Sequence, residues 1–100
     1  MDEILSVPGV DGTMIGPSDL SASLGYRGDP DSREVQRVIR SVAEAHKGTN
    51  VCPGIASNPR DAEKHIEMGF RLVNVGSDIG FMGMAARETL KRLRRFLKRI

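Results

Sequence analysis

The sequence predicts an α/β fold built from three consecutive β/α units. Short apolar runs alternate with segments of helical spacing, glycines bound several of these runs, and connections of a few residues join them. This alternation is typical of parallel strands joined by helical crossovers. Three strands are too few to close a barrel, so we expect residues 1–100 to form a single partial domain of a larger parallel fold.

Three segments have the composition of buried strands, namely Val10–Gly16, Asn50–Ala56 and Phe70–Gly76. Each is short and apolar, as strands of a parallel sheet often are. The second has the least favourable composition for a strand, because Pro53 and Gly54 weaken a strand.

Helices are expected before, between and after these strands. Residues 2–7 and 18–24 resemble short helices that end at Pro8-Gly9 and Gly25. Asp31 is the expected N-cap of the next helix, with Glu34 completing a capping box and Gly48 ending the helix. One apolar stripe of this helix is formed by Val35, Val38, Ile39 and Val42.

Two further helices complete the pattern. Asn58 is the expected cap of the first, with Pro59 at its first helical position. Ser77 or Asp78 is expected to cap the second, which runs to the end of the sequence. Its last turns repeat apolar residues at spacings of four and three, which requires a partner surface: Ala86, Leu90, Leu93, Leu97 and Ile100.

Composition excludes several classes of protein. The net charge is only +2, whereas dedicated nucleic-acid binders usually carry a broad basic excess. Residues 87–100 hold seven basic side chains and one acid, while the rest of the chain holds eight basic and twelve acidic ones. We interpret this basic run as a solvated helix face, and we expect neither nucleic acid nor membrane as a partner.

Cys52 is the single cysteine, so the chain can form neither an internal disulfide nor a zinc site from cysteine pairs. We expect it to be buried as a small apolar residue in a cytoplasmic protein. No apolar run is long enough to span a membrane, and the first residues do not resemble a signal peptide.

The segment IGPSDLS contains the candidate ligand-binding residues. A strand is expected to end at Ile15, and Gly16-Pro17 then turns the chain so that Ser18 and Asp19 begin a helix. The first amides of a helix have no acceptor within it, so a carboxylate can bind there. The Asp19 carboxylate would repel such an anion. A divalent cation between the two groups would allow both to lie there. The alternative is that Ser18 and Asp19 only cap the helix.

The stretch VPGVDGTMIGPSDLSASLGYRGDPDSREVQ resembles the HpcH/HpaI aldolases, which are metal-dependent pyruvate aldolases. The family segment reads D-G-x-x-I-G-P-[AS]-D-L-S-x-S-x-G, and every fixed position is present from Asp11 to Gly25. The later LVNVGSD and the helix after it are similar to the last strand and helix of the family.

The resemblance implies a (β/α)₈ TIM barrel of which this chain is the C-terminal part. It implies metal-dependent retro-aldol cleavage of a 4-hydroxy-2-oxo acid to pyruvate and an aldehyde, with Mg²⁺, Mn²⁺ or Co²⁺ as cofactor. Asp19 is then a metal ligand, and the amides of Ser18 and Asp19, with Gly16 alongside, bind the pyruvate carboxylate. The last helix is typically exchanged between subunits in the family, so a homo-oligomer is expected.

The resemblance also implies that the second metal carboxylate, the arginine and the histidine acid/base precede this segment, which therefore holds no catalytic residue of its own. His46 and His65 do not match the family histidine. We expect His46 to compensate the dipole at a helix C-terminus or to be a surface residue, and His65 to be exposed. A complementing N-terminal barrel segment is then needed for activity. The alternative is a non-catalytic remnant or assembly module that docks through its C-terminal helix. A third hypothesis is nucleic-acid binding through that basic helix.

Overall fold

The computed structural model describes residues 1–100 and contains five helices and three strands. The chain order is α1 (Asp2–Leu5), β1 (Gly12–Ile15), α2 (Pro17–Ser23), α3 (Arg33–Ala45), β2 (Cys52–Ala56), α4 (Ala62–Met68), β3 (Leu72–Asn74) and α5 (Asp78–Lys98). The predicted alternation of strands and helices is confirmed. None of the helices has the length and apolarity that crossing a membrane requires.

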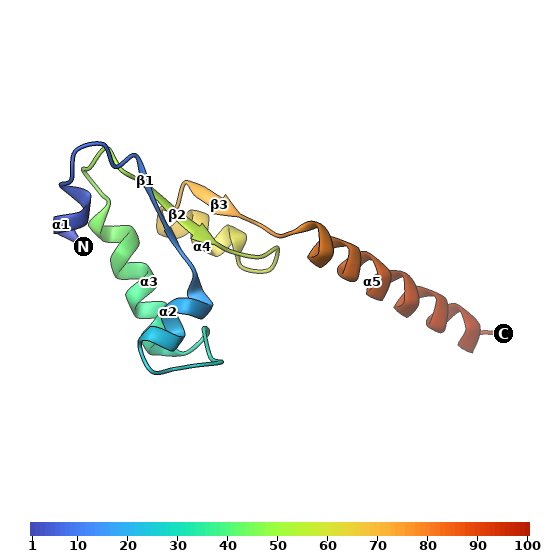
Figure 1. The fold of residues 1–100 in the computed structure, drawn as a ribbon. Helices are drawn as coiled ribbons and strands as arrows, with labels where there is room; N and C mark the ends of the chain where they lie inside the picture. The colour runs from blue at the N-terminus through green and yellow to red at the C-terminus, as the bar shows by residue number, and fades with distance from the viewer.

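The strands form one parallel sheet in the order β1-β2-β3, and α3 and α4 are the crossovers between them (Figure 1). Ile15 pairs with Ile55, which pairs with Val73, so these three side chains lie in one row on the same face of the sheet. That face is the one that the helices cover. Met14 and Leu72 belong to the alternate row and are about half exposed, so the other face is open.

The core lies between α3 and the covered face of the sheet. It consists of Val35, Ile39, Ala43, Ile55 and Phe70, with Ile15, Leu20, Met68 and Val73 packed against it. The apolar stripe predicted for α3 is the side of the helix that contributes to this core. Val35 and Ile39 are fully buried, whereas Val38 and Val42 lie at the border of the stripe and are partly exposed.

The central strand is the one whose sequence looked least favourable. Proline has no N–H for a strand ladder, yet Pro53 lies within β2. Pairing of β2 with β3 begins only at Gly54, so Pro53 precedes the ladder on that side. Its carbonyl still accepts a hydrogen bond from the Arg71 amide at 2.9 Å.

Two predicted helix starts are wrong in detail. The N-cap of α3 is Ser32, not Asp31, and the Ser32 hydroxyl accepts from the Val35 amide at 3.3 Å. α4 begins at Ala62 rather than at Pro59. Asn58 does cap the turn before it, because its side-chain oxygen accepts from the Asp61 amide at 2.8 Å.

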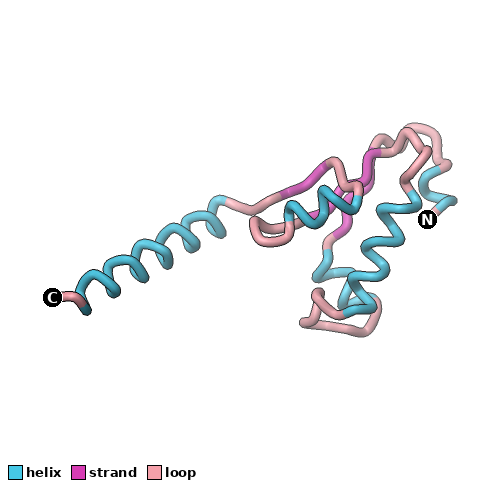
Figure 2. Tube along the Cα trace, turned by 180° about the vertical axis from the view of Figure 1, so that it is seen from behind, coloured by secondary structure: helices cyan, strands magenta, loops and turns pink.

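α5 projects away from the rest of the molecule (Figures 1 and 2). Its N-cap is Ser77, one of the two residues predicted for this position, and the Ser77 hydroxyl accepts from the Gly80 amide at 3.1 Å. No residue of α5 is buried, so the predicted apolar stripe is bare. Met82 and Met84, in the first half of α5, are also exposed and do not pack in the core.

Candidate functional site

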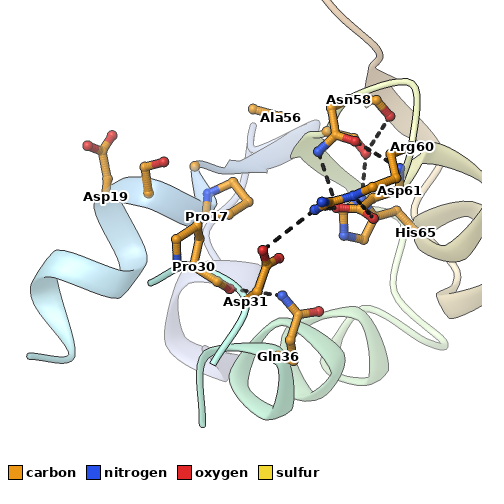
Figure 3. A pocket seen from close by; sticks show the side chains of 13 residues that line it. Pro17, Asp19, Pro30, Asp31, Gln36, Ala56, Asn58, Arg60, Asp61 and His65 are labelled. Carbon is orange, nitrogen blue, oxygen red and sulfur yellow. Dashed lines mark hydrogen bonds and ion pairs between the residues drawn. The ribbon is translucent and has the colours of Figure 1, made fainter. Parts of the chain in front are cut away.

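A pocket of about 360 Å³ lies at the carboxyl edge of the sheet (Figure 3). Its walls come from the residues after β1, the start of α3 and the loop after β2. Carboxyl ends of parallel strands are the usual place for ligand sites in α/β folds. Thirteen residues line the pocket: Gly16, Pro17, Ser18, Asp19, Pro30, Asp31, Gln36, Ala56, Ser57, Asn58, Arg60, Asp61 and His65.

All three residues selected from the sequence, Gly16, Ser18 and Asp19, lie at this pocket. Gly16 is the N-cap of α2, and Pro17 is its first helical residue. The first intrahelical hydrogen bond therefore runs from the Leu20 amide to the Gly16 carbonyl, at 2.8 Å. The amides of Ser18 and Asp19 precede it and have no acceptor within the helix.

Gly16 leaves room for the Asp19 carboxylate. A Cβ atom at Gly16 would lie 3.2 Å from Asp19 Oδ2, which is closer than most side-chain contacts. Asp19 is exposed and has no ion pair in the structure. Its carboxylate points away from the charged residues at the other end of the pocket (Figure 3).

That other end is a network centred on Arg60. The Arg60 guanidinium donates two hydrogen bonds to the Asp61 carboxylate, at 3.1 and 3.0 Å, and lies 3.5 Å from Asp31 Oδ2. Asn58 donates a further hydrogen bond to Asp61 at 3.2 Å. The hydrogen bonds from Arg60, supported by Asn58, lower the pKa of Asp61 to about 2. The same two carboxylates raise the pKa of Arg60.

His65 forms the floor of this end of the pocket, and the prediction that it is exposed is wrong. It is only 3% exposed, and its Nδ1 lies 2.6 Å from the Ser57 hydroxyl. Phe70 packs edge-on against the ring, with centroids 6.0 Å apart. Burial lowers the pKa of His65, and the positive charge of Lys64 lowers it further.

His46 lies at a helix C-terminus, as predicted, but it is buried and not a surface residue. It is the C-cap of α3 and is 4% exposed. Its Nδ1 lies 2.7 Å from the Val42 carbonyl, which can only accept, so Nδ1 carries the proton. Nε2 lies 2.8 Å from the Thr13 hydroxyl. His46 therefore ties α3 to β1 and does not reach the pocket.

Cys52, Ser77 and Asp78 lie outside the pocket. Cys52 is partly exposed rather than buried and forms no disulfide. Ser77 and Asp78 follow β3 at the same edge of the sheet, but Ser77 caps α5 and neither residue lines the pocket.

The chain does not hold a complete metal site by itself. No three His, Cys, Asp or Glu side chains gather closely enough to surround a metal ion. Asp31 and Asp61 are paired with Arg60, whereas Asp19 is free. Its carboxylate offers the kind of oxygen ligand that Mg²⁺ and Mn²⁺ prefer.

Comparison with known proteins shows the family of the chain. The family model described as HpcH/HpaI aldolase/citrate lyase matches residues 1–85. The chain belongs to the HpcH/HpaI aldolase/citrate lyase family. A structure of an HpcH/HpaI aldolase/citrate lyase family protein from Burkholderia cenocepacia superposes with a TM-score of 0.86 and 36% identity. The match covers 93% of this chain and 37% of that one.

Two curated relatives are similar in sequence. Hydroxypyruvate/pyruvate aldolase of Chromohalobacter salexigens is 39% identical over 91% of this chain and 36% of its own length. 4-Hydroxy-2-oxo-heptane-1,7-dioate aldolase of Escherichia coli is 40% identical over 86% of this chain and 33% of its own length. The chain thus spans about a third of the HpcH/HpaI relatives that it matches.

Sequence reasoning missed the half of the pocket formed by Ser57, Arg60, Asp61 and His65. One signal was available, because Ser57 and Asn58 directly follow a strand whose end lies beside Gly16. The register of β1 and β2 makes these two strand ends neighbours. The pairing of Arg60 with Asp31 joins residues 29 positions apart, and no local pattern indicates it.

Proposed function

We propose that this chain is the C-terminal part of a (β/α)₈ barrel that acts as a carbon–carbon lyase. The reaction is metal-dependent retro-aldol cleavage of a 4-hydroxy-2-oxo acid to pyruvate and an aldehyde. The observation that carries the proposal is that Gly16, Ser18 and Asp19 line one pocket at the carboxyl edge of the sheet. Family membership and the aldolase names of the relatives support it.

Within this proposal, Asp19 is a metal ligand and the amides of Ser18 and Asp19 bind the pyruvate carboxylate. The lining contains three carboxylates and one guanidinium, so an anion is repelled unless a cation neutralises part of this charge. A bound Mg²⁺, Mn²⁺ or Co²⁺ would supply a Lewis acid beside the keto group. Gly16 keeps the pocket open where a side chain would meet Asp19.

The rest of the active site comes from other β/α units in this proposal. A single carboxylate is a poor Mg²⁺ site, which normally has further oxygen ligands. β1 and β3 are the two edges of the sheet and offer unpaired backbone groups to further strands. A complementing N-terminal barrel segment would pair there, and its residues would complete the pocket. The chain alone is then expected to leave the methyl protons of pyruvate unexchanged in D₂O.

The test is NMR of the isotope-labelled 100-residue chain mixed with the first five β/α units of a relative, with Mn²⁺ and then pyruvate. Paramagnetic Mn²⁺ bound at Asp19 is expected to broaden the amide signals of residues 16–20 selectively. Pyruvate added with Mg²⁺ is expected to shift the amides of Ser18 and Asp19, and not in the absence of a divalent ion. Asp19→Asn should abolish both effects because it removes the charged ligand.

Asp29→Asn is the matched control, since Asp29 is an exposed carboxylate in the neighbouring loop without an ion pair. It should leave both effects unchanged. Equal broadening in wild type and Asp19→Asn would contradict the proposal, as would pyruvate shifts that do not depend on a divalent ion.

The second candidate is an assembly module without catalysis, and the bare apolar side of α5 favours it. In that case Asp19→Asn has no effect on any binding property of the chain. Mixing the chain with the first five β/α units of a relative then restores complex formation but no cleavage.

A further inference from the structure

The open face of the sheet has a row of three residues at the carboxyl ends of the strands. Ala56 pairs with Asn74 in the register of β2 and β3. In the register of β1 and β2, the position after the last pair places Gly16 beside Ala56. Gly16 has an extended backbone, so the alternation of β1 continues through it and places it on the face opposite Ile15. The row Gly16, Ala56 and Asn74 therefore lies on the open face.

The Asp19 carboxylate lies over the same face. A Cβ atom at Gly16 would project from the open face, and the atom nearest to it would be Asp19 Oδ2, at 3.2 Å. Asp19 is thus above the end of β1, whereas Asn74 is the last residue of β3. Two strand spacings, about 10 Å in all, separate these strand ends. Ala56 lies between them and has only a methyl group, so no long side chain fills the interval.

Asn74 has the only strong hydrogen-bond donors among the strand side chains of this face. Its Oδ1 accepts a hydrogen bond from the Gly76 amide at 3.0 Å, which determines how the side-chain amide is turned. The Nδ2 group then has two N–H donors and no hydrogen-bond partner in the protein, and the residue is exposed. The other positions of the face hold Gly12, Met14, Gly16, Cys52, Gly54, Ala56 and Leu72.

We propose that Asn74 is a specificity-determining residue, which donates a hydrogen bond to a hydroxyl group on the aldehyde half of the substrate. This inference rests on the proposed function, which places the pyruvate half of the 4-hydroxy-2-oxo acid at Gly16, Ser18 and Asp19. A substrate that extends from there along the open row reaches Asn74 with its other half. The preferred aldehyde then has a hydroxyl group on the carbon next to its carbonyl.

The distance across the sheet selects this hydroxyl rather than the reacting oxygen. The C4 oxygen of the substrate is only two carbons away from the keto group, which the proposed function holds beside Asp19. Asn74 is two strand spacings from β1, so the substrate oxygen within its reach belongs to a carbon beyond C4. A neutral hydroxyl suits this position, because the open face of the strands has no cation to pair with a carboxylate. An alkyl chain would leave the N–H donors of Asn74 without a partner.

The test compares glycolaldehyde with propionaldehyde, in which a methyl group replaces the hydroxyl group. The full chain is mixed with the first five β/α units of a relative, Mg²⁺ and pyruvate, and aldol addition is followed by NMR. In the wild type, kcat/KM for glycolaldehyde should exceed that for propionaldehyde by about tenfold, and Asn74→Ala should bring the two within about twofold. This ratio does not depend on how much of a variant is folded, because both aldehydes are measured on the same protein.

Two further variants separate the donors of Asn74 from its role in the turn. Asn74→Asp keeps an oxygen for the Gly76 amide but removes both N–H donors, so it should also lose the preference for glycolaldehyde. Asn50→Ala is the matched control, because Asn50 is an exposed asparagine in the loop before β2, at the opposite edge of the sheet. It should keep the preference of the wild type.

Exchange of the methyl protons of pyruvate in D₂O tests the proposed function separately, because it needs no aldehyde. If the wild-type mixture shows no exchange, the proposed function is wrong, and the role of Asn74 is wrong with it. If exchange occurs and Asn74→Ala leaves the preference unchanged, only the role of Asn74 is wrong. If Asn74→Asp retains the preference that Asn74→Ala loses, Asn74 acts through the turn at Gly76 and not as a donor to the substrate.

Discussion

His65 is the buried group whose protonation the fold opposes. Its ring lies among Ser57, Phe70 and the covered face of the sheet, and burial lowers its pKa below the ordinary 6.5. The unfolded chain therefore binds a proton more readily than the folded chain as the pH falls below about 6.5. The stability that neutral His65 contributes is complete above that pH and is lost as the pH falls towards the folded pKa.

Urea unfolding at a series of pH values between 7.5 and 5 checks this expectation. The free energy of unfolding should fall with decreasing pH in the wild type. His65→Phe keeps an aromatic ring against Phe70 but cannot titrate, so its curve should be flatter over the same range. Parallel curves for the two proteins would show that His65 does not cause the pH dependence.

Gly54 shows how one residue allows the central strand to pair closely on both sides. A Cβ atom at Gly54 would lie 2.4 Å from the Thr13 carbonyl oxygen and 3.3 Å from that of Leu72. Both contacts are to backbone, which cannot move aside without disturbing the ladder. Gly54 was one of the two residues that disfavoured a strand in the sequence. The central position of β2 between two close neighbours nevertheless requires a glycine there.

At the scale of elements, two neighbouring residues at the start of α3 have different roles. Ser32 accepts the hydrogen bond from the Val35 amide, whereas Asp31 lies outside the helix and faces Arg60. Ser32→Ala should lower the free energy of unfolding by about 1 kcal/mol, because it removes the cap. Asp31→Ala should change it by less than about 0.5 kcal/mol, because exposed ion pairs contribute little.

Chemical denaturation of the two single variants measures this difference. α3 contributes Val35, Ile39 and Ala43 to the core. Loss of its cap should therefore destabilise the whole fold. If Asp31→Ala lowers the free energy of unfolding more than Ser32→Ala does, Asp31 is the N-cap, as the sequence predicted.

At the scale of the whole molecule, α5 makes the chain elongated. The radius of gyration is 17.7 Å and the extents are 64 × 27 × 21 Å. A compact domain of this length has a radius of gyration of about 13 Å. Small-angle scattering of dilute monomer should give a value near the larger figure. Removal of residues 86–100 should bring it down towards the compact value.

The same truncation should leave the thermal midpoint nearly unchanged, since α5 contributes no buried residue to the core. The control for the truncation is Ile39→Ala, which truncates a fully buried side chain. It should lower the free energy of unfolding by about 2–5 kcal/mol. A large fall in the midpoint on truncation, or a compact scattering profile of the full chain, would mean that α5 packs against the body in solution.

Local signals by themselves determined much of this protein. The order of elements, the apolar stripe of α3, the Ser77 cap and the clustering of Gly16, Ser18 and Asp19 at a strand end all depend on residues close in the chain. Periodicity and capping act over about four residues, so a single sequence displays them. The bare stripe of α5 was predictable for the same reason.

Only the tertiary structure decided what is buried and what faces the pocket. His46 and His65 are both buried, and His46 contacts Thr13, which is 33 positions away in the sequence. Arg60 reaches Asp31 across the pocket because β1 and β2 end side by side, and the neighbouring strands accommodate β2 despite Pro53. Burial and long-range pairing depend on how separate segments pack, and no local pattern of residues contains that information.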